Sequence, residues 1–169
     1  GIWGKAHQNQ MLAATALFAV GGALWAGNDN RFGHTLWQSS DALMLSAASV
    51  FALNNVFQRE RPRDTADPDR WFQGFGNTSF PSGHVTLTAA AITPLVLEYG
   101  REHPWVYALE VIPLYEAVGR VKTQEHWQSD VLAGWAIGSL IGWYAHSRKV
   151  PLLVMILPRG FAVGLQARF

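Results

Sequence analysis

The sequence contains no cysteine, and charged residues are scarce. Without cysteine, disulfide bonds and thiolate metal sites are excluded. Only 15% of the residues are charged, the formal net charge is +1, and the basic residues are scattered, so no basic stripe would bind nucleic acid. The first ten residues, GIWGKAHQNQ, lack the basic stretch and apolar run of a signal peptide. We therefore expect neither a nucleic-acid partner nor a signal peptide within this chain.

Hydrophobic residues are abundant, at 49% of 169 residues, and the mean hydropathy is +0.05. A chain of this length fits one domain with a real core, so we expect a single domain over residues 1–169. The uncharged stretches are shorter than the roughly 20 apolar residues of a spanning helix. Glu110 and Glu116 also fall inside an expected helix. Two interpretations stay open: a soluble or peripheral bundle, slightly favoured, and a small integral bundle with its charges turned inward.

Helical periodicity and turn residues divide the chain into five expected helices, over residues 11–26, 35–57, 82–99, 104–118 and 123–147. Residues 58–80 are rich in charge, proline, glycine and aromatic residues, which is typical of a functional loop. The last residues alternate between hydrophobic and small or polar side chains, which predicts a β-hairpin over 150–169 that turns at Pro158, Arg159 and Gly160. The expected fold is an all-α bundle of five or six helices with a short C-terminal β-hairpin.

Two short motifs place histidine where it could do chemistry. His126 precedes Asp130 by four residues, and on a helix such residues share one face. Asp130 could then accept a hydrogen bond from one ring nitrogen and leave the other nitrogen's lone pair free to attack an electrophile. Ser82, Gly83 and His84 stand at the expected start of a helix. Backbone N–H groups there favour an oxyanion, with which an imidazole could exchange a proton.

A third motif gathers arginines at the end of the second expected helix: Arg59, Arg61 and Arg63. A guanidinium fork suits bidentate recognition of phosphate. The loop that follows carries three aromatic residues, which suit a greasy substrate and a cap on the core equally well: Trp71, Phe72 and Phe75. Each motif also has an ordinary structural alternative: a His–Asp pair on a helix surface, a serine N-cap, or a charged helix end in solvent. Taken singly, no motif points to a function.

The order and spacing of the motifs resemble one known pattern. The chain reads N-x6-R-P over residues 54–62, P-S-G-H over 81–84 and R-x5-H-x3-D over 120–130. Together these are similar to the three-part signature of the type 2 phosphatidic acid phosphatase superfamily, which also includes bacterial class A acid phosphatases and vanadium haloperoxidases. The resemblance spans about residues 35–147, which we expect to form the catalytic core.

This resemblance implies a phosphatase that needs neither a metal ion nor a cofactor. His126 would be the nucleophile that forms a phosphohistidine, oriented by Asp130, while His84 would protonate the leaving oxygen and then activate water. The positions that hold phosphate in the family match Arg61, Arg120, Ser82, Gly83 and Asn54. The implied substrate is a phosphate monoester or pyrophosphate on a small molecule or, better suited to this apolar chain, a lipid. The implied location is the cell envelope, periplasmic or membrane-associated, with the active site facing the periplasm.

Two positions depart from the family pattern. The first motif normally begins with lysine, where this chain has Asn54, and the third usually has serine before its arginine, where it has Gly119. An amide donates a hydrogen bond but brings no positive charge; Arg59 and Lys122 are candidates to supply one. The missing lysine keeps open the hypothesis of a non-catalytic module that binds phosphate or a lipid headgroup. The shared anion pocket keeps open a third, a vanadate-dependent haloperoxidase.

Overall fold

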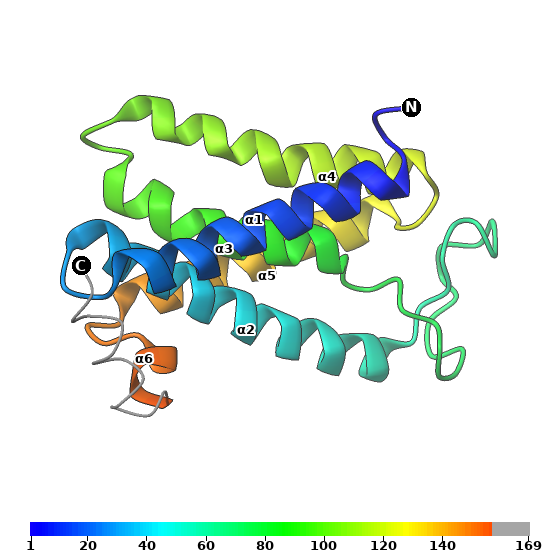
Figure 1. The fold of residues 1–169 in the computed structure, drawn as a ribbon. Helices are drawn as coiled ribbons and strands as arrows, with labels where there is room; N and C mark the ends of the chain where they lie inside the picture. The colour runs from blue at the N-terminus through cyan, green and yellow to red at the C-terminus, as the bar shows by residue number, and fades with distance from the viewer. Residues whose placement is uncertain (157–169) are drawn as a thin grey trace.

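The chain folds into a bundle of helices, and a computed structural model describes residues 1–156 (Figure 1). This described part contains no strand, so the expected all-α class is confirmed for it. Within residues 1–156, six α-helices and one 3-10 helix follow one another: α1 (Lys5–Ala26), α2 (Arg31–Phe57), α3 (Gly83–Tyr99), η1 (Pro104–Glu110), α4 (Val111–Lys122), α5 (Gln128–Ser147) and α6 (Leu152–Ile156).

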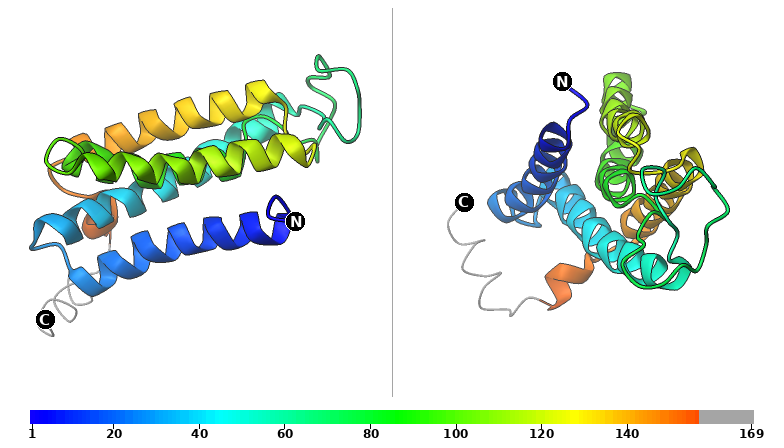
Figure 2. Two further views of the ribbon diagram at one scale, coloured as in Figure 1. Left: turned by 90° about the horizontal axis from the view of Figure 1, so that it is seen from above. Right: turned by 90° about the vertical axis from the view of Figure 1, so that its right-hand side faces the viewer.

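Helix α3 lies at the centre of the bundle (Figure 2). It packs against α1, α2, α4 and η1, and most extensively against α5, which runs in the same direction. Small residues allow this approach: Ala89 and Ala90 are fully buried, and a Cβ on Gly138 would lie 2.3 Å from the carbonyl oxygen of Thr86. Because backbone meets backbone here, the position of α5 fixes where α3 begins.

One end of the bundle collects the first residues of α1, the end of α2, the long loop, the start of α3 and the α4–α5 turn (Figure 1). Helix α2 ends where Gln58 adopts a left-handed backbone with φ 45°. The loop is fastened to that end by backbone hydrogen bonds, from the N–H of Phe72 to the carbonyl of Phe57 (2.9 Å) and from the N–H of Ser79 to the carbonyl of Arg59 (3.1 Å). The loop is thereby held over the start of α3.

Helix boundaries differ from the expected ones where local caps decide them. Helix α1 begins at Lys5 rather than at residue 11, and the helix expected over 104–118 starts as the 3-10 helix η1 and ends at Lys122. The helix expected from residue 123 begins only at α5, because the Asp130 carboxylate accepts the backbone N–H of Trp127 (2.9 Å) and caps the helix there. His126 therefore lies in a turn.

The predicted C-terminal β-hairpin is not supported. Its first expected strand contains α6 instead, whose first backbone N–H groups are accepted by the carboxylate of Asp41, from Leu152 and from Leu153 (2.8 Å). A fully buried carboxylate that receives two first-turn donors favours a helix start over a strand. The turn expected at residues 158–160 and the second strand lie outside the described residues.

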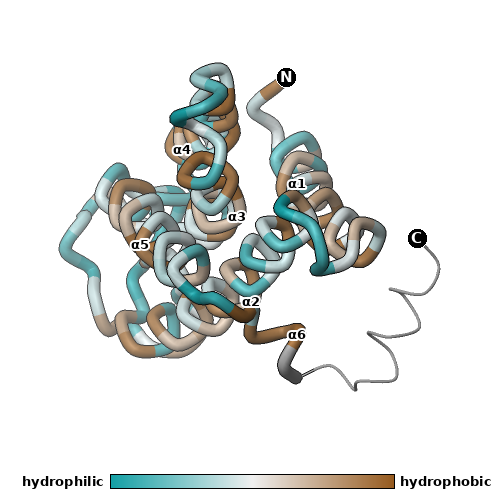
Figure 3. The backbone as a smooth tube through the Cα atoms, turned by 90° about the vertical axis from the view of Figure 1, so that its left-hand side faces the viewer, coloured by the Kyte–Doolittle hydropathy of each residue, from teal (hydrophilic) through white to brown (hydrophobic). Residues whose placement is uncertain are grey.

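Helices α1 and α2 are each long and apolar enough to cross a membrane, by length and composition alone. Much of their surface is exposed in the isolated chain, since most residues in their apolar windows lie outside the core. Figure 3 shows hydrophobic stretches along helices on several sides of the bundle. The exposed hydrophobic surface is therefore not confined to one helix.

Candidate active site

The three sequence motifs meet at the end of the bundle that carries the long loop. The guanidiniums of Arg61 and Arg120 both lie against the carboxylate of Glu125, Arg120 at 3.7 Å. The positive charges of the same two arginines act on the imidazoles of both His84 and His126. Residues from the end of α2, the start of α3 and the α4–α5 turn thus share one electrostatic environment.

His126 is almost fully buried, and its tautomer is fixed by a backbone carbonyl. Its Nδ1 lies 2.7 Å from the carbonyl oxygen of Ser79, which only accepts, so Nδ1 carries the proton and the lone pair is on Nε2. Burial first, and then the positive charges of Arg120 and Arg61, lower the pKa of His126 to about 3. The ring is therefore neutral near pH 7, with one nitrogen able to act as a nucleophile.

Asp130 does not make the predicted hydrogen bond to His126. Its Oδ2 is 4.0 Å from His126 Nδ1, because His126 precedes α5 and the two residues do not share a helical face. The carboxylate instead accepts from the Ser79 hydroxyl (2.6 Å), from Arg59 Nη1 (2.5 Å) and from the N–H of Trp127. Asp130 acts on the imidazole only indirectly, by accepting from the hydroxyl of Ser79, whose carbonyl accepts the hydrogen bond from His126 Nδ1.

His84 lies in the first turn of α3 and is held by the first helix of the chain. Its Nε2 is 2.9 Å from Oδ1 of Asn9. Burial lowers the pKa of His84 to about 4, and the charges of Arg120 and Arg61 act in the same direction, while Glu125 opposes them. His84 is therefore also neutral near pH 7 in the absence of a bound anion.

Glu125 is the centre of the positive charges. It accepts from Arg61 and Arg63, it pairs with Lys5 (2.8 Å), and Arg120 approaches it. Burial raises the pKa of Glu125, but the hydrogen bond from Lys5 and the three guanidiniums outweigh that effect and lower it to about 2. The carboxylate is therefore ionised at any ordinary pH and fixes the arginines that surround it.

Ser82 and Gly83 stand at the start of α3 as predicted, but Ser82 contributes differently. Its backbone N–H donates to the carbonyl of Asp130 (3.1 Å), so this N–H is not turned to an anion. Its hydroxyl is fully buried and has no hydrogen-bond partner within residues 1–156. The N–H groups of Gly83, His84 and Val85 belong to the first helical turn, where no intrahelical acceptor precedes them. Together they form a helix N-terminus that favours an oxyanion.

Asn54, the departure from the family lysine, lies in the last turn of α2. Its amide oxygen is buried without a hydrogen-bond partner among the described residues. One turn earlier, Val50 Cγ1 is 3.4 Å from the point where a Cβ on Gly83 would stand, so this face of α2 lies against the start of α3. Neither residue suggested as a replacement charge has that role: Arg59 is bound to Asp130, and Lys122 lies over the ring of Trp3.

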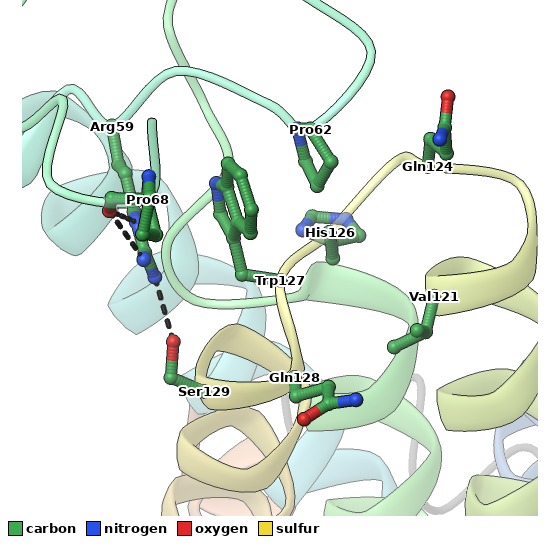
Figure 4. Close-up of a pocket in the computed structure, with 9 residues that line it drawn as sticks. All are labelled: Arg59, Pro62, Pro68, Val121, Gln124, His126, Trp127, Gln128 and Ser129. Carbon is green, nitrogen blue, oxygen red and sulfur yellow. Dashed lines mark hydrogen bonds between the residues drawn. The ribbon is translucent and has the colours of Figure 1, made fainter. Parts of the chain in front are cut away.

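A cavity of about 470 Å³ opens beside His126 (Figure 4). Pro62, Val121 and Trp127 line it together with the imidazole. The indole nitrogen of Trp127 donates to the carbonyl of Glu60 (2.9 Å), which ties the wall to the long loop. His126 thus lines a cavity large enough for a small phosphate ester, but His84, Arg61 and Arg120 are not among the residues that line it.

Of the three aromatic residues in the long loop named above, one packs against other rings and two are exposed. Trp71 packs edge-on against Phe57 and Phe80 and lies over the guanidinium of Arg59 at 4.2 Å. Phe72 and Phe75 are exposed to solvent. One of the three therefore caps the core, and two lie on the surface at the same end of the bundle as the site.

Several site residues were not predicted from the sequence. Helix α1 supplies three, Lys5, Gln8 and Asn9, and Gln8 accepts from Arg120 (3.3 Å). The only signal was their position: a polar stretch directly before a long apolar run. Glu125 could have been noticed as a lone acid between two site residues, Arg120 and His126. Within the described residues, no group of three histidine, aspartate or glutamate side chains could hold a metal ion.

The fold and the site define a helical bundle that carries two neutral imidazoles and a cluster of guanidiniums at one end. The chain belongs to the PAP2 superfamily, whose family model matches residues 35–151. It is 30% identical over 135 residues to a lipid A 1-phosphatase of Porphyromonas gingivalis, a match that covers 79% of this chain and 28% of that protein. It is 33% identical over 66 residues to an undecaprenyl-diphosphatase of Sulfolobus acidocaldarius, which covers 38% of this chain and 31% of that protein.

The chain thus spans less than a third of the length of these two relatives. No solved structure matches it significantly. Helix α1, which supplies Lys5, Gln8 and Asn9, lies before the region that the family model matches. Membership of the superfamily therefore says nothing about the part that α1 plays in the site.

Proposed function

We propose that the protein is a phosphatase that hydrolyses a phosphate monoester or a diphosphate, without a metal ion, through a phosphohistidine. One observation carries this proposal: a buried, neutral imidazole with its lone pair on Nε2 lies beside two guanidiniums, those of Arg61 and Arg120. A nucleophile next to fixed positive charge suits attack on an anionic phosphorus centre. Superfamily membership and the two phosphatase relatives support the same reaction class.

In this mechanism Nε2 of His126 attacks phosphorus, and the bond from phosphorus to the leaving oxygen breaks. Arg61, Arg120, the Ser82 hydroxyl and the N-terminus of α3 hold the phosphoryl oxygens. His84 gives a proton to the leaving oxygen, then takes one from the water that releases phosphate from His126. A phosphate dianion beside His84 raises its pKa from the low value set by burial, so the substrate itself promotes protonation of the acid.

We propose further that the substrate is a lipid phosphate and that the protein is associated with a membrane of the cell envelope. One relative is a lipid A 1-phosphatase and the other is an undecaprenyl-diphosphatase. Two helices are long and apolar enough to span a bilayer, and Phe72 and Phe75 of the long loop are exposed. In the proposed orientation the end that carries the long loop faces the periplasm.

Replacing His126 with alanine tests the covalent mechanism. The variant should lose measurable turnover of p-nitrophenyl phosphate and retain its helical circular dichroism spectrum, since only the nucleophile is removed. His103→Ala is the matched control, because His103 lies at the opposite end of α3 and should leave turnover unchanged. A His126→Ala protein that hydrolyses the ester near the wild-type rate would falsify the phosphohistidine route.

Assays on the same purified protein distinguish the proposed phosphatase from two alternative functions. Asn54 in place of lysine favours a module that binds phosphate without turnover, and that module would bind vanadate while releasing no phosphate. A haloperoxidase would oxidise bromide with peroxide only after vanadate is added. Phosphate release that persists in EDTA and is inhibited by vanadate, without bromide oxidation, is the result expected for the proposed phosphatase.

A further inference from the structure

Gln8 and Asn9 are neighbours in the first turns of α1, and their side chains reach residues of two other helices. Gln8 Oε1 accepts a hydrogen bond from Nη1 of Arg120 in α4 at 3.3 Å. Asn9 Oδ1 lies 2.9 Å from Nε2 of His84 at the start of α3. One helix thus contacts two residues of the candidate active site that are far apart in the chain.

The start of α1 is fixed against α4. The ring of Trp3 stacks on the ring of Tyr115 with centroids 5.4 Å apart, and the ammonium of Lys122 lies 4.6 Å from the centroid of a Trp3 ring. The hydroxyl of Tyr115 donates to the carbonyl of Ile2. A hydrogen bond from this part of α1 can therefore hold a site residue in place, because the element that supplies it is itself anchored.

The amide of Gln8 is fully buried, and Gly119 provides the space for it. A Cβ at residue 119 would lie 1.8 Å from Gln8 Nε2 and 2.9 Å from Gln8 Cδ, so a side chain there would displace the amide. This packing gives a physical reason for Gly119, one of the two departures from the family pattern. A buried amide costs free energy unless it is hydrogen-bonded, and among the described residues only Arg120 bonds to it.

Arg120 needs this acceptor because its guanidinium is buried and has few other partners. The side chain is 6% exposed, Nε has no hydrogen-bond partner among the described residues, and Glu125 lies 3.7 Å from Nη2. Gln8 supplies the acceptor at Nη1. Since that acceptor is a neutral amide, it orients the guanidinium without cancelling its charge, which remains available to an anion.

Asn9 determines which nitrogen of His84 can exchange a proton with a ligand. The amide oxygen of Asn9 only accepts, so Nε2 of the neutral ring carries the proton and the lone pair is on Nδ1. A ring held in this way takes and gives protons at Nδ1 while its Nε2–H stays bound to Asn9. A general acid requires such a fixed orientation toward the atom that it protonates.

We propose that Gln8 and Asn9 are positioning residues of the phosphatase site: Gln8 orients Arg120 toward the phosphoryl group, and Asn9 directs Nδ1 of His84 toward the leaving oxygen. This inference rests on the proposed phosphatase function and extends its site to α1, which precedes the region that the family model matches. As the bond from phosphorus to the leaving oxygen breaks, the proton on Nδ1 of the protonated ring passes to that oxygen. The ring remains as the neutral tautomer with its proton on Nε2.

Titration of the full chain in detergent with orthovanadate, followed by calorimetry, tests Gln8 without turnover. Gln8→Met keeps the length of the side chain and removes the acceptor. It should bind vanadate about fivefold more weakly than the wild type, the factor that about 1 kcal/mol produces. Gln10→Met is the matched control, because Gln10 is exposed on another face of α1, and it should bind vanadate like the wild type.

Gly119→Ala displaces the amide of Gln8 by a second route, since the added methyl group occupies the space of Nε2. It should weaken vanadate binding by a similar factor, and it replaces Gln8→Met if that variant loses its helical circular dichroism spectrum. A vanadate affinity that is unchanged in Gln8→Met, or that falls equally in Gln10→Met, would overturn the role of Gln8.

Asn9→Leu removes the acceptor at His84, and its effect should depend on the leaving group. An alkoxide needs a proton from the general acid, whereas p-nitrophenolate leaves readily without one. Asn9→Leu should therefore slow hydrolysis of hexyl phosphate about tenfold more than hydrolysis of p-nitrophenyl phosphate, while Gln8→Met slows both by similar factors. Equal factors for the two esters in Asn9→Leu would refute the role of Asn9, because a general displacement of α1 affects both esters alike.

The tautomer of His84 provides a test of Asn9 that requires no turnover. With isotope-labelled histidine, nitrogen chemical shifts of the wild type at about pH 8 should show the proton on Nε2 of His84, and Asn9→Leu should show a mixture of both tautomers. The His84→Gln variant identifies the signals. A wild-type ring protonated on Nδ1 would contradict the assignment. A chain that hydrolyses neither ester would end the proposed phosphatase function, whereas the vanadate titration and the tautomer still decide the roles of Gln8 and Asn9.

Discussion

Asn54 occupies the position at which the family pattern has a lysine, whose positive charge would favour anion binding. It occupies the last turn of α2, on the face that lies against the start of α3, and its amide oxygen has no hydrogen-bond partner among the described residues. The cations of the site, Arg61 and Arg120, lie against Glu125, as do Lys5 and Arg63. The amide therefore offers one neutral donor at a position where the family has an ammonium.

Asn54→Lys should strengthen oxyanion binding. A charged donor contributes about 1 kcal/mol more than a neutral one, so the inhibition constant for vanadate should fall by about fivefold. Asn55→Lys is the control, because Asn55 is the exposed neighbour and adds the same charge on another face of α2. An inhibition constant that is unchanged in Asn54→Lys, or that falls equally in both variants, would show that position 54 does not face the anion.

Glu116 is a fully buried carboxylate one turn before Arg120 in α4. Neither of its carboxylate oxygens has a hydrogen-bond partner among the described residues. Burial raises its pKa to about 7, although Arg120 opposes this. The folded state therefore keeps a proton that the unfolded state releases as pH rises above 4.5. Stability is lost between pH 4.5 and about 7 and does not change further above that range.

Glu116→Gln removes this titration while it keeps the shape of the side chain. The variant should match the wild-type melting temperature near pH 4.5 and exceed it at pH 8, where the wild type loses on the order of 2 kcal/mol. Melting curves of both proteins, followed by circular dichroism across this pH range, provide the measurement. A melting temperature that differs by the same amount at every pH would mean that Glu116 does not titrate between the two states.

Motif residues could be named from the sequence, but Lys5, Gln8, Asn9 and Glu125 could not, and neither could several contacts. His84, Arg61 and Arg120 follow from motif spacing. The hydrogen bond of His126 was assigned wrongly, because an i+4 spacing implies a shared helical face only inside a helix, and α5 begins after His126. The pairing of Lys5 with Glu125 joins residues far apart in the chain, and no local pattern encodes such a contact.

At the scale of the elements, the contact between α3 and α5 depends on glycine. Gly134, Gly138 and Gly142 recur every four residues on α5, and a Cβ at each would lie within 3.0 Å of an atom of α3 or its N-cap. The contacts at Gly138 and Gly142 include backbone carbonyl oxygens of α3, which have no room to move aside. This spacing keeps the start of α3 next to Asp130, whose carbonyl accepts the N–H of Ser82.

Gly138→Ala should therefore destabilise the protein, by about 1 to 3 kcal/mol, because the added methyl group overpacks the interface. Gly21→Ala in α1 is the control: its Cβ would lie 3.5 Å from Leu17, an ordinary contact, so the better helix former should leave stability unchanged or raise it by up to about 1 kcal/mol. Thermal unfolding of both variants gives the comparison. A Gly138→Ala protein as stable as Gly21→Ala would show that the two helices separate without cost.

The existence of the five long helical segments was predictable because apolar periodicity and turn residues mark them. Their ends were not, since Asp130 and Asp41 cap helices through side chains whose roles depend on tertiary contacts. The same reason explains the wrong hairpin prediction. The apolar run over 150–156 is compatible with a strand, but the buried Asp41 carboxylate offers acceptors to a helix start.

At the scale of the whole molecule, chemistry and hydrophobic surface are separated. The segments that carry the charged cluster and the imidazoles, namely the end of α2, the start of α3 and the α4–α5 turn, meet at one end of the bundle (Figure 1). Near the opposite end of α3, an apolar cavity of about 480 Å³ lies between α1, α3 and η1, lined by residues such as Phe18, Leu95 and Leu109. The helix sides between the two ends expose large hydrophobic residues.

That exposed surface predicts how the purified chain behaves. Leu17 of α1 and Phe51 of α2 are each 73% exposed, and Leu132 and Leu140 of α5 are exposed as well, so apolar side chains face outward on several helices. Contiguous apolar surface of this kind is rarely left to water. The chain should therefore pellet with membranes, resist extraction by high salt, and dissolve in a mild detergent.

Size-exclusion chromatography after detergent removal provides the decisive measurement. Hydrophobic association should convert the protein into large aggregates. Apolar surface is exposed on several helices, and contact with one other molecule cannot cover all of it. Leu132→Glu/Leu140→Glu, which places two charges on α5, should increase the fraction recovered without detergent, whereas Asp64→Glu/Asp67→Glu in the solvated loop should not. A wild-type chain that elutes as a monomer in plain buffer would contradict membrane association and favour a water-soluble substrate.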